Sequence, residues 1–253
     1  MIRKWFLELR RRNRLSADTG LFYLFVFIGL AILTLFDPRE LLGVSVWNKP
    51  LKFFVSTTVL FWTIGWIMVD IPNQKAVKFI SRSVFLLLTG ELILIFYQAV
   101  QGKQSHFNIA TPIDSAIFGT MGILIFLNSL CFIYLLFLIS KVETLPEGYK
   151  RGIQLGLVIF LIGGYEGYLM AGRLGHTIGA ADGQDGYFFL GWAKAYGDLR
   201  VFHFMGLHAL QVLSLMGWYF FRNKPWRITL FGILYFLMSS SILWNSLQGK
   251  SLF

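Results

Sequence analysis

Seven long apolar segments constrain this chain more than any other feature of its sequence. They lie at roughly residues 20–36, 51–70, 84–101, 114–140, 152–173, 201–221 and 227–247. A helix needs about 20 apolar residues to cross the hydrocarbon core of a bilayer. Because a backbone in lipid must satisfy its own hydrogen bonds, each segment is predicted to be a transmembrane helix. The sequence therefore predicts an all-α integral membrane bundle of about seven helices.

The composition argues against a soluble protein. Hydrophobic residues make up 56% of the chain and charged residues only 14%, whereas soluble domains carry about 25% charged residues. Seven spans and short connections account for all 253 residues, so residues 1–253 are predicted to form a single transmembrane domain. Cys131 is the one cysteine, which excludes an intramolecular disulfide and a cysteine-based zinc motif.

The basic residues predict an orientation. The net charge is +10, and the Lys and Arg residues flank the apolar segments, which indicates a membrane surface rather than nucleic acid as the partner. Fifteen of them fall on the side of the N-terminus and eight on the other side. The positive-inside rule then predicts an inner N-terminus and an outer C-terminus. Residues 1–18 are predicted to contain a basic amphipathic helix lying in the interface.

One connection on the predicted outer side is long. Residues 174–200 contain six glycines, together with the aromatic residues Tyr187, Phe188, Phe189, Trp192 and Tyr196. The glycines predict that this loop lacks a long helix. Its length and its aromatics predict a lid folded over the outer face. The alternative is that the aromatics form a belt at headgroup level.

Ionisable residues inside the spans are the strongest candidates for function. Glu91 and Glu166 lie one or more turns below the predicted outer surface. An ionised group at such depth costs several kcal/mol unless it is paired or used. Both are therefore candidate catalytic residues. A structural ion pair between Glu166 and Arg173, which share a helix face, is an alternative of equal weight.

The histidines suggest a metal or a cofactor. All four fall in the predicted outer half: His106, His176, His203 and His208. With Glu166 they could supply ligands for zinc or iron, and His106, His203 or His208 could be axial ligands of haem b. No HExxH spacing is present. The sharpest expectation is that His106, Glu166 and either His203 or His208 converge on one cavity.

Two classes of function remain open. The first is a membrane-embedded redox or hydrolytic enzyme built on a metal or haem at this site. The second is a non-enzymatic protein, either a transporter or receptor for a small outer-side ligand or a structural subunit of a membrane complex. In the second class the candidate ligand-binding residues are Lys49, Lys52, Arg173, Arg200 and Asp198. The four basic residues among them would receive an anionic group. The expected partners are the lipid bilayer and either another membrane protein or a second copy of the chain.

Three strings carry a resemblance. Residues 47–53 (WNKPLKF), 105–108 (SHFN) and 203–211 (HFMGLHALQ) resemble those of an uncharacterised family of multipass bacterial inner-membrane proteins. The resemblance implies a bacterial inner membrane and nothing about activity. The chain is superficially similar to the seven-helix zinc hydrolases of the ceramidase and adiponectin-receptor group, but its last span has no His. That span also has no internal Lys for a retinal Schiff base.

Overall fold

The computed structural model describes residues 2–252, and its regular structure is almost entirely helical. The helices are α1 (Ile2–Arg12), α2 (Arg14–Leu33), α3 (Asn48–Ile67), α4 (Gln74–Val100), α5 (Pro112–Ser140), α6 (Glu147–Arg173), α7 (Arg200–Tyr219) and α8 (Pro225–Leu247). A short 3-10 turn, η1 (Met68–Asp70), follows α3. Seven helices, α2 to α8, are long and apolar enough to cross a membrane. The prediction of an all-α chain with seven spans is confirmed.

The strands are minor elements that close two loops. Strands β1 (Glu40–Leu41) and β2 (Val44–Ser45) pair between α2 and α3, and β3 (Thr177–Ile178) pairs with β4 (Gly197–Asp198) between α6 and α7. The chain divides into two compact units, residues 1–131 and 132–253, and α5 runs from the first into the second. A single domain over residues 1–253 stays a prediction.

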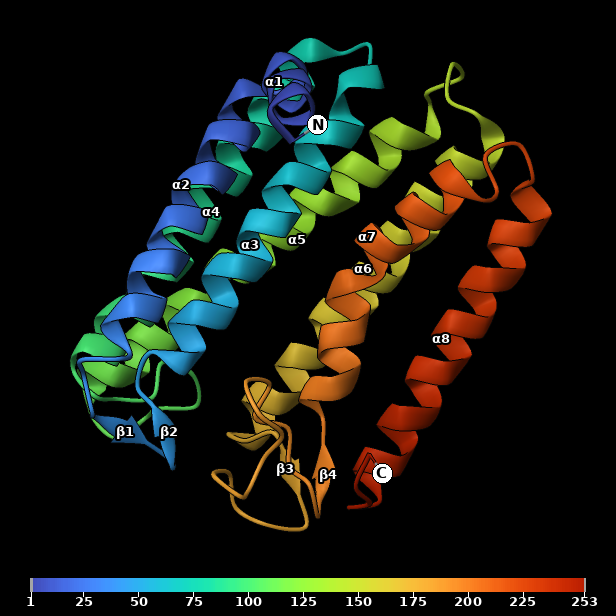
Figure 1. Cartoon of the computed structure of the whole chain (residues 1–253). Helices are drawn as coiled ribbons and strands as arrows, with labels where there is room; N and C mark the ends of the chain where they lie inside the picture. Colours follow the sequence, from blue (N-terminus) through green and yellow to red (C-terminus); the bar gives the residue numbers. More distant parts are fainter. Residues whose placement is uncertain (1, 253) are drawn as a thin grey trace. The chain divides into compact units, whose positions relative to one another are not determined.

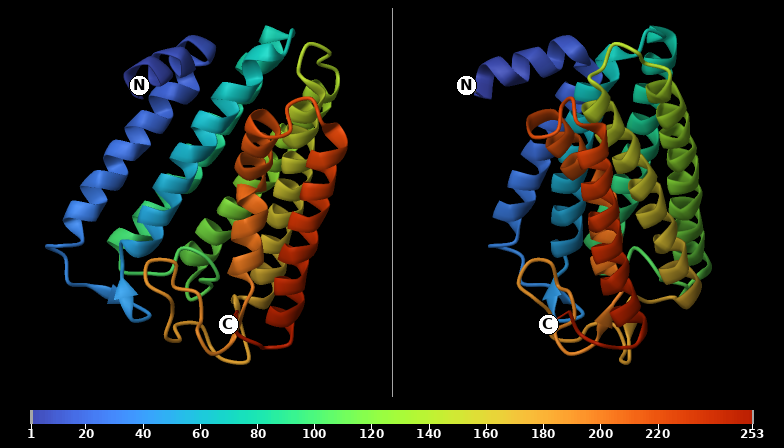
Figure 2. Two further views of the ribbon diagram at one scale, coloured as in Figure 1. Left: turned by 45° about the vertical axis from the view of Figure 1, so that its right-hand side comes forward. Right: turned by 90° about the vertical axis from the view of Figure 1, so that its right-hand side faces the viewer.

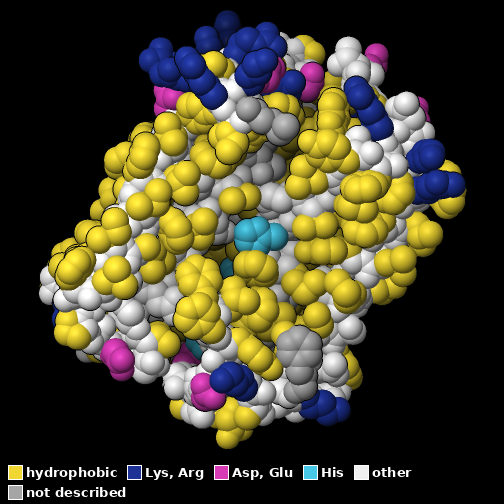
Figure 3. Space-filling view, in the orientation of Figure 1, with side chains coloured by type: hydrophobic (Ala, Val, Ile, Leu, Met, Phe, Trp, Pro, Cys, Tyr) yellow, Lys and Arg dark blue, Asp and Glu magenta, His cyan; other side chains and the backbone are white. Residues whose placement is uncertain are grey.

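In the first unit, α1 is fixed against the ends of α2 and α3, while the β1–β2 hairpin lies at the opposite end (Figures 1 and 2). Leu9 is fully buried, and the Trp5 ring stacks on Trp66 of α3 with centroids 6.1 Å apart. The side chain of Asn13 caps α2 by accepting from the Ser16 amide, 3.0 Å away. Lys and Arg side chains gather around α1 in Figure 3. The predicted helix is present, and its place at the membrane surface stays a prediction.

In the second unit, glycines bring α6 and α7 into backbone contact. A Cβ atom added at Gly163 would lie 2.6 Å from the Cα atom of Gly206, and one added at Gly156 would lie 2.8 Å from the Cα atom of Leu210. Such small-residue stripes let transmembrane helices approach closely. Helix α8 completes the unit through a core that includes Ile159, Leu213 and Ile228. The close packing of α6 on α7 brings Glu166 and His203 together.

The loop between α6 and α7 folds as short hairpins rather than as a helix, as its glycines predict. The β3–β4 pair closes its base, and Gly186 bridges to Ala193 further out. Trp192 and Tyr196 are half-buried, and the Trp192 ring lies 5.4 Å from the ring of Phe204 on α7. Phe188, in contrast, is almost fully exposed. The partial burial of Trp192 and Tyr196 agrees with a loop that folds onto the helices, and the role of the loop as an outer lid stays a prediction.

Candidate functional site

Glu166 and His203 form a buried pair in the second unit. Glu166 lies on α6 and is only 2% exposed. His203 reaches it from α7, with its Nδ1 atom 3.6 Å from Oε2 of Glu166. The same Nδ1–H donates to the carbonyl oxygen of Gly163, 2.8 Å away. A Cβ atom at Gly167 would lie 3.1 Å from the imidazole, so Gly167 leaves the space that the ring occupies.

The carboxyl group of Glu166 has no hydrogen-bond donor in the part of the chain that the structure describes, at either oxygen. Arg173, the alternative partner suggested by the sequence, is exposed. Among residues 2–252 no ion pair joins it to Glu166. The basic partner of this carboxyl group is therefore His203, and Asp198 is close enough for its charge to act on Glu166 as well. His208 lies further along α7 and packs against Phe204, with ring centroids 4.3 Å apart, within electrostatic reach of His203.

A second pair, Glu91 with His106, lies in the first unit, and the sequence did not predict it. Glu91 of α4 is also 2% exposed, and neither of its oxygens has a hydrogen-bond donor among the described residues. The Nε2 atom of His106 lies 3.4 Å from Oε1 of Glu91, and Ser105 Oγ lies 3.1 Å from the Nδ1 atom of His106. Lys49 is close enough for its charge to act on Glu91.

The loop from Gln101 to Thr111 brings His106 to Glu91. Gly102 ends α4 with a φ of +67°, a conformation that glycine adopts without strain. Phe107 takes a φ of +62°, which is uncommon for a residue with a side chain. Its ring packs edge-on against His106 and against Phe118 of α5, with centroids 6.1 and 5.8 Å apart. These aromatic contacts hold the imidazole beside Glu91.

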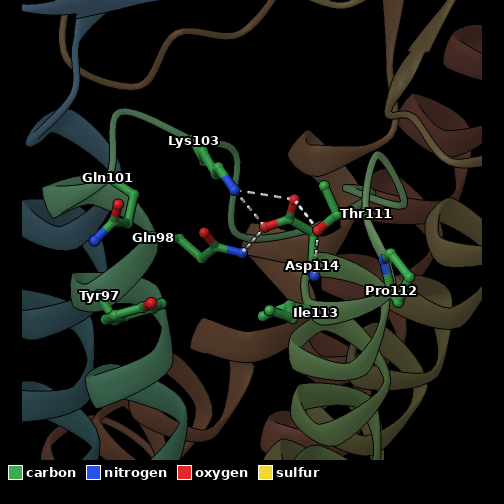
Figure 4. Close-up of a pocket in the computed structure, with 8 residues that line it drawn as sticks. All are labelled: Tyr97, Gln98, Gln101, Lys103, Thr111, Pro112, Ile113 and Asp114. Atoms are coloured by element: carbon green, nitrogen blue, oxygen red, sulfur yellow. Dashed lines mark hydrogen bonds and ion pairs between the residues drawn. The ribbon is translucent and has the colours of Figure 1, made fainter.

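The same loop covers a buried aspartate at the start of α5. Figure 4 shows Gln98, Lys103 and Thr111 directed at Asp114. The carboxylate, 1% exposed, accepts from Gln98 Nε2 at 3.0 Å, from Lys103 Nζ at 3.2 Å and from Thr111 Oγ1 at 2.7 Å. A cavity of about 370 Å³ lies beside it. The loop thus places one basic side chain on each of two buried carboxyl groups.

A third ionic cluster orders the loop between α6 and α7. Asp198 is buried and accepts from Arg200 Nη2 at 2.6 Å and from the Ala193 amide at 2.9 Å. Burial raises the pKa of Asp198, but the Arg200 guanidinium, the Ala193 amide and His176 together hold that pKa below its usual range. His176 Nδ1 lies 3.3 Å from Asp182 and 3.8 Å from Asp198. Arg200, a predicted anion ligand, is therefore engaged within its own loop.

The other predicted anion ligands are divided between the units. Lys49 lies near the ring of Phe53, 5.8 Å from its centroid, and Lys52 is half-buried on the same helix, α3. Arg173 is exposed at the end of α6. The role of these cations as anion ligands stays a prediction.

The structure does not support the predicted metal set of His106, His176, His203, His208 and Glu166. Within residues 2–252 no group of three or more His, Cys, Asp or Glu side chains is placed to hold a metal ion. Protein zinc sites take at least three such ligands as a rule. Two of the histidines instead each lie beside one buried carboxyl group, Glu91–His106 in the first unit and Glu166–His203 in the second. No protein family, curated protein or solved structure matches the chain significantly.

Proposed function

We propose that this chain is a proton-linked membrane transport protein whose proton sites are the Glu166–His203 and Glu91–His106 pairs. One observation carries the proposal: two carboxyl groups inside spanning helices are each 2% exposed, lack any hydrogen-bond donor among the described residues, and lie 3.6 and 3.4 Å from an imidazole nitrogen. Because residues 47–53, 105–108 and 203–211 resemble strings of multipass bacterial inner-membrane proteins, we also propose that the protein resides in a bacterial inner membrane.

The two buried carboxyl groups are the first part of the proposed proton path. An ionised carboxylate without donors is strongly disfavoured in a low-dielectric interior. Binding a proton removes the charge. Chains of Asp, Glu and His within spans are accordingly the usual proton relays of pumps and transporters. A buried carboxyl group that lacks a hydrogen-bond donor and lies beside an imidazole suits such a relay better than it suits structural pairing.

The imidazoles supply the second step. An imidazole can both accept and donate a proton, and the His106 and His203 side chains are 24% and 29% exposed. Each ring therefore lies between a buried carboxyl group and more accessible surroundings. The separations of 3.4 and 3.6 Å exceed the usual hydrogen-bond length of about 2.9 Å. A small movement of the ring would make and break the contact through which a proton passes.

Proton flux into proteoliposomes tests this proposal. Liposomes holding the purified protein and an internal pH-sensitive dye are given a potassium diffusion potential, and the change in internal pH is followed. We expect flux above that of protein-free liposomes, reduced to that background by Glu166→Gln or Glu91→Gln. Glu147→Gln is the matched control, because Glu147 begins the same helix as Glu166 but is exposed. Flux that persists in both site variants would reject the proposal.

One observation favours haem or metal binding as a second candidate. His203 donates its Nδ1–H to the carbonyl oxygen of Gly163, which fixes the tautomer and leaves Nε2 as the atom with a lone pair. Histidines that ligate metals are commonly held in this way. The visible absorption spectrum and the iron and zinc content of the purified protein test this candidate. His203→Ala should abolish any haem band or bound metal, and a protein lacking both would eliminate it.

A further inference from the structure

The cavity beside Asp114 is independent of both proton pairs. It lies in the first unit, where the end of α4 meets the start of α5, and has a volume of about 370 Å³ (Figure 4). Small-molecule sites range over about 300–1,000 Å³. Its polar lining includes Gln98, Lys103, Thr111 and Asp114, and its apolar lining includes Ile113 and the ring of Tyr97. The cavity thus suits a small ligand with one polar end.

The lining contains an acceptor that lacks a donor. Gln98 is 0% exposed, and its Nε2 atom donates to Asp114 at 3.0 Å. Because a carboxylate only accepts, the amide must present its nitrogen to Asp114. Its oxygen, Oε1, is then left without a donor among the described residues, and it carries no dashed line in Figure 4. Buried acceptors are nearly always satisfied, so this oxygen points to a ligand that donates.

Lys103 already shows which kind of donor the site accepts. Its Nζ atom lies 3.2 Å from both oxygens of Asp114, farther than the roughly 2.7–2.9 Å of a good ammonium–carboxylate contact. Its side chain is 44% exposed and reaches in from the loop. Lys103 is therefore a loosely held ammonium group at the mouth of the cavity, on a side chain that can swing into solvent.

We propose that this cavity binds a small organic molecule with a primary ammonium group, which displaces Lys103 from Asp114. The three N–H groups of such a ligand can donate to Asp114 and to the Oε1 atom of Gln98 at once. Its carbon chain would lie along Ile113 and the ring of Tyr97. An anion would be repelled by Asp114. A hard metal ion would need about six oxygen ligands, more than Asp114 and Gln98 offer.

Binding of ethylammonium by the detergent-purified full chain, measured by calorimetry, tests the proposal. Lys103→Met removes the competing ammonium but keeps the apolar stem. We expect it to tighten ethylammonium binding at least tenfold. Asp114→Asn should abolish binding. Lys194→Met is the control, because Lys194 forms a comparable ion pair with Asp185 at 3.0 Å on an exposed loop of the other unit, and it should change nothing.

A second ligand keeps the test decisive even if Asp114→Asn does not fold. Tetramethylammonium has the same charge but no N–H group, so the Lys103→Met protein should bind it at least tenfold more weakly than ethylammonium. Equal binding of the two cations would overturn the proposal, as would a Lys103→Met protein that binds no ethylammonium. The latter result would mean that Gln98 Oε1 is satisfied by water.

Discussion

The close packing of α6 on α7 predicts that Gly163→Ala lowers the thermal stability, by an amount that can be worked out from the structure. In Gly163→Ala, the new Cβ atom would lie 2.6 Å from the Cα atom of Gly206 and 2.9 Å from its carbonyl carbon. Ordinary contacts begin at 3.4 Å, so the two helices must separate by about 0.8 Å. Overpacking of this kind costs about 1–3 kcal/mol. For a chain of this size, each kcal/mol lowers Tm by about 2–4 °C.

Thermal unfolding of the detergent-purified protein measures this effect. We expect Gly163→Ala to lower Tm by about 2–12 °C, the product of these ranges. Gly172→Ala is the matched control, because Gly172 lies on the same helix and its added Cβ would meet nothing within 4 Å. That change should leave Tm unchanged or raise it, since Ala favours the helix by about 1 kcal/mol over Gly. Equal Tm values for the two variants would refute the packing argument.

Three other predictions concern the loop between α6 and α7 and the start of α2. Asp198 has a lowered pKa, so its pair with Arg200 should stabilise the loop above the ordinary carboxyl pKa and be lost as pH falls through the lowered value. Hydrogen exchange of residues 174–199 should therefore be slow in the wild type at pH 7 and fast in Asp198→Asn, and equal rates would contradict the pairing. Gly183→Cys, in a Cys131→Ala background, should react with an impermeant maleimide in intact cells, and labelling only after lysis would reverse the predicted orientation. Asn13→Ala should lose the α2 cap and its bond to Ser81, lowering stability by about 1 kcal/mol in chemical unfolding, and an unchanged midpoint would show that the cap contributes nothing.

The sequence predicted the existence of the helices better than their ends. The third span was predicted to begin near residue 84, whereas α4 begins at Gln74. Lys75, Lys78 and Arg82 make the first turns too polar to be read as part of a span. The helix nevertheless extends through them, because Asn73 caps it by accepting from the Ala76 amide. Hydropathy locates the lipid-spanning part of a helix, whereas capping residues decide where the helix itself begins.

The sequence predicts only those contacts of the site that follow from the order of the helices along the chain. Glu166 was expected to meet His203 or His208 because the two helices follow one another in the chain. Which histidine it meets depends on the carbonyl of Gly163 and on the space at Gly167, details that helix periodicity does not contain. The contact of Glu91 with His106 depends on the path of a loop, and that path follows from backbone conformations that the sequence pattern did not reveal.

Infrared spectroscopy of the membrane-reconstituted protein tests the central claim most directly, because a protonated carboxyl group has a C=O stretching band distinct from that of a carboxylate. We predict that this band is present in the wild type and shrinks as the pH rises. Glu166→Gln and Glu91→Gln should each remove part of it, whereas Glu147→Gln should leave it unchanged. A spectrum with no protonated carboxyl band, or one that neither site variant alters, would contradict the assignment of these two residues as proton sites.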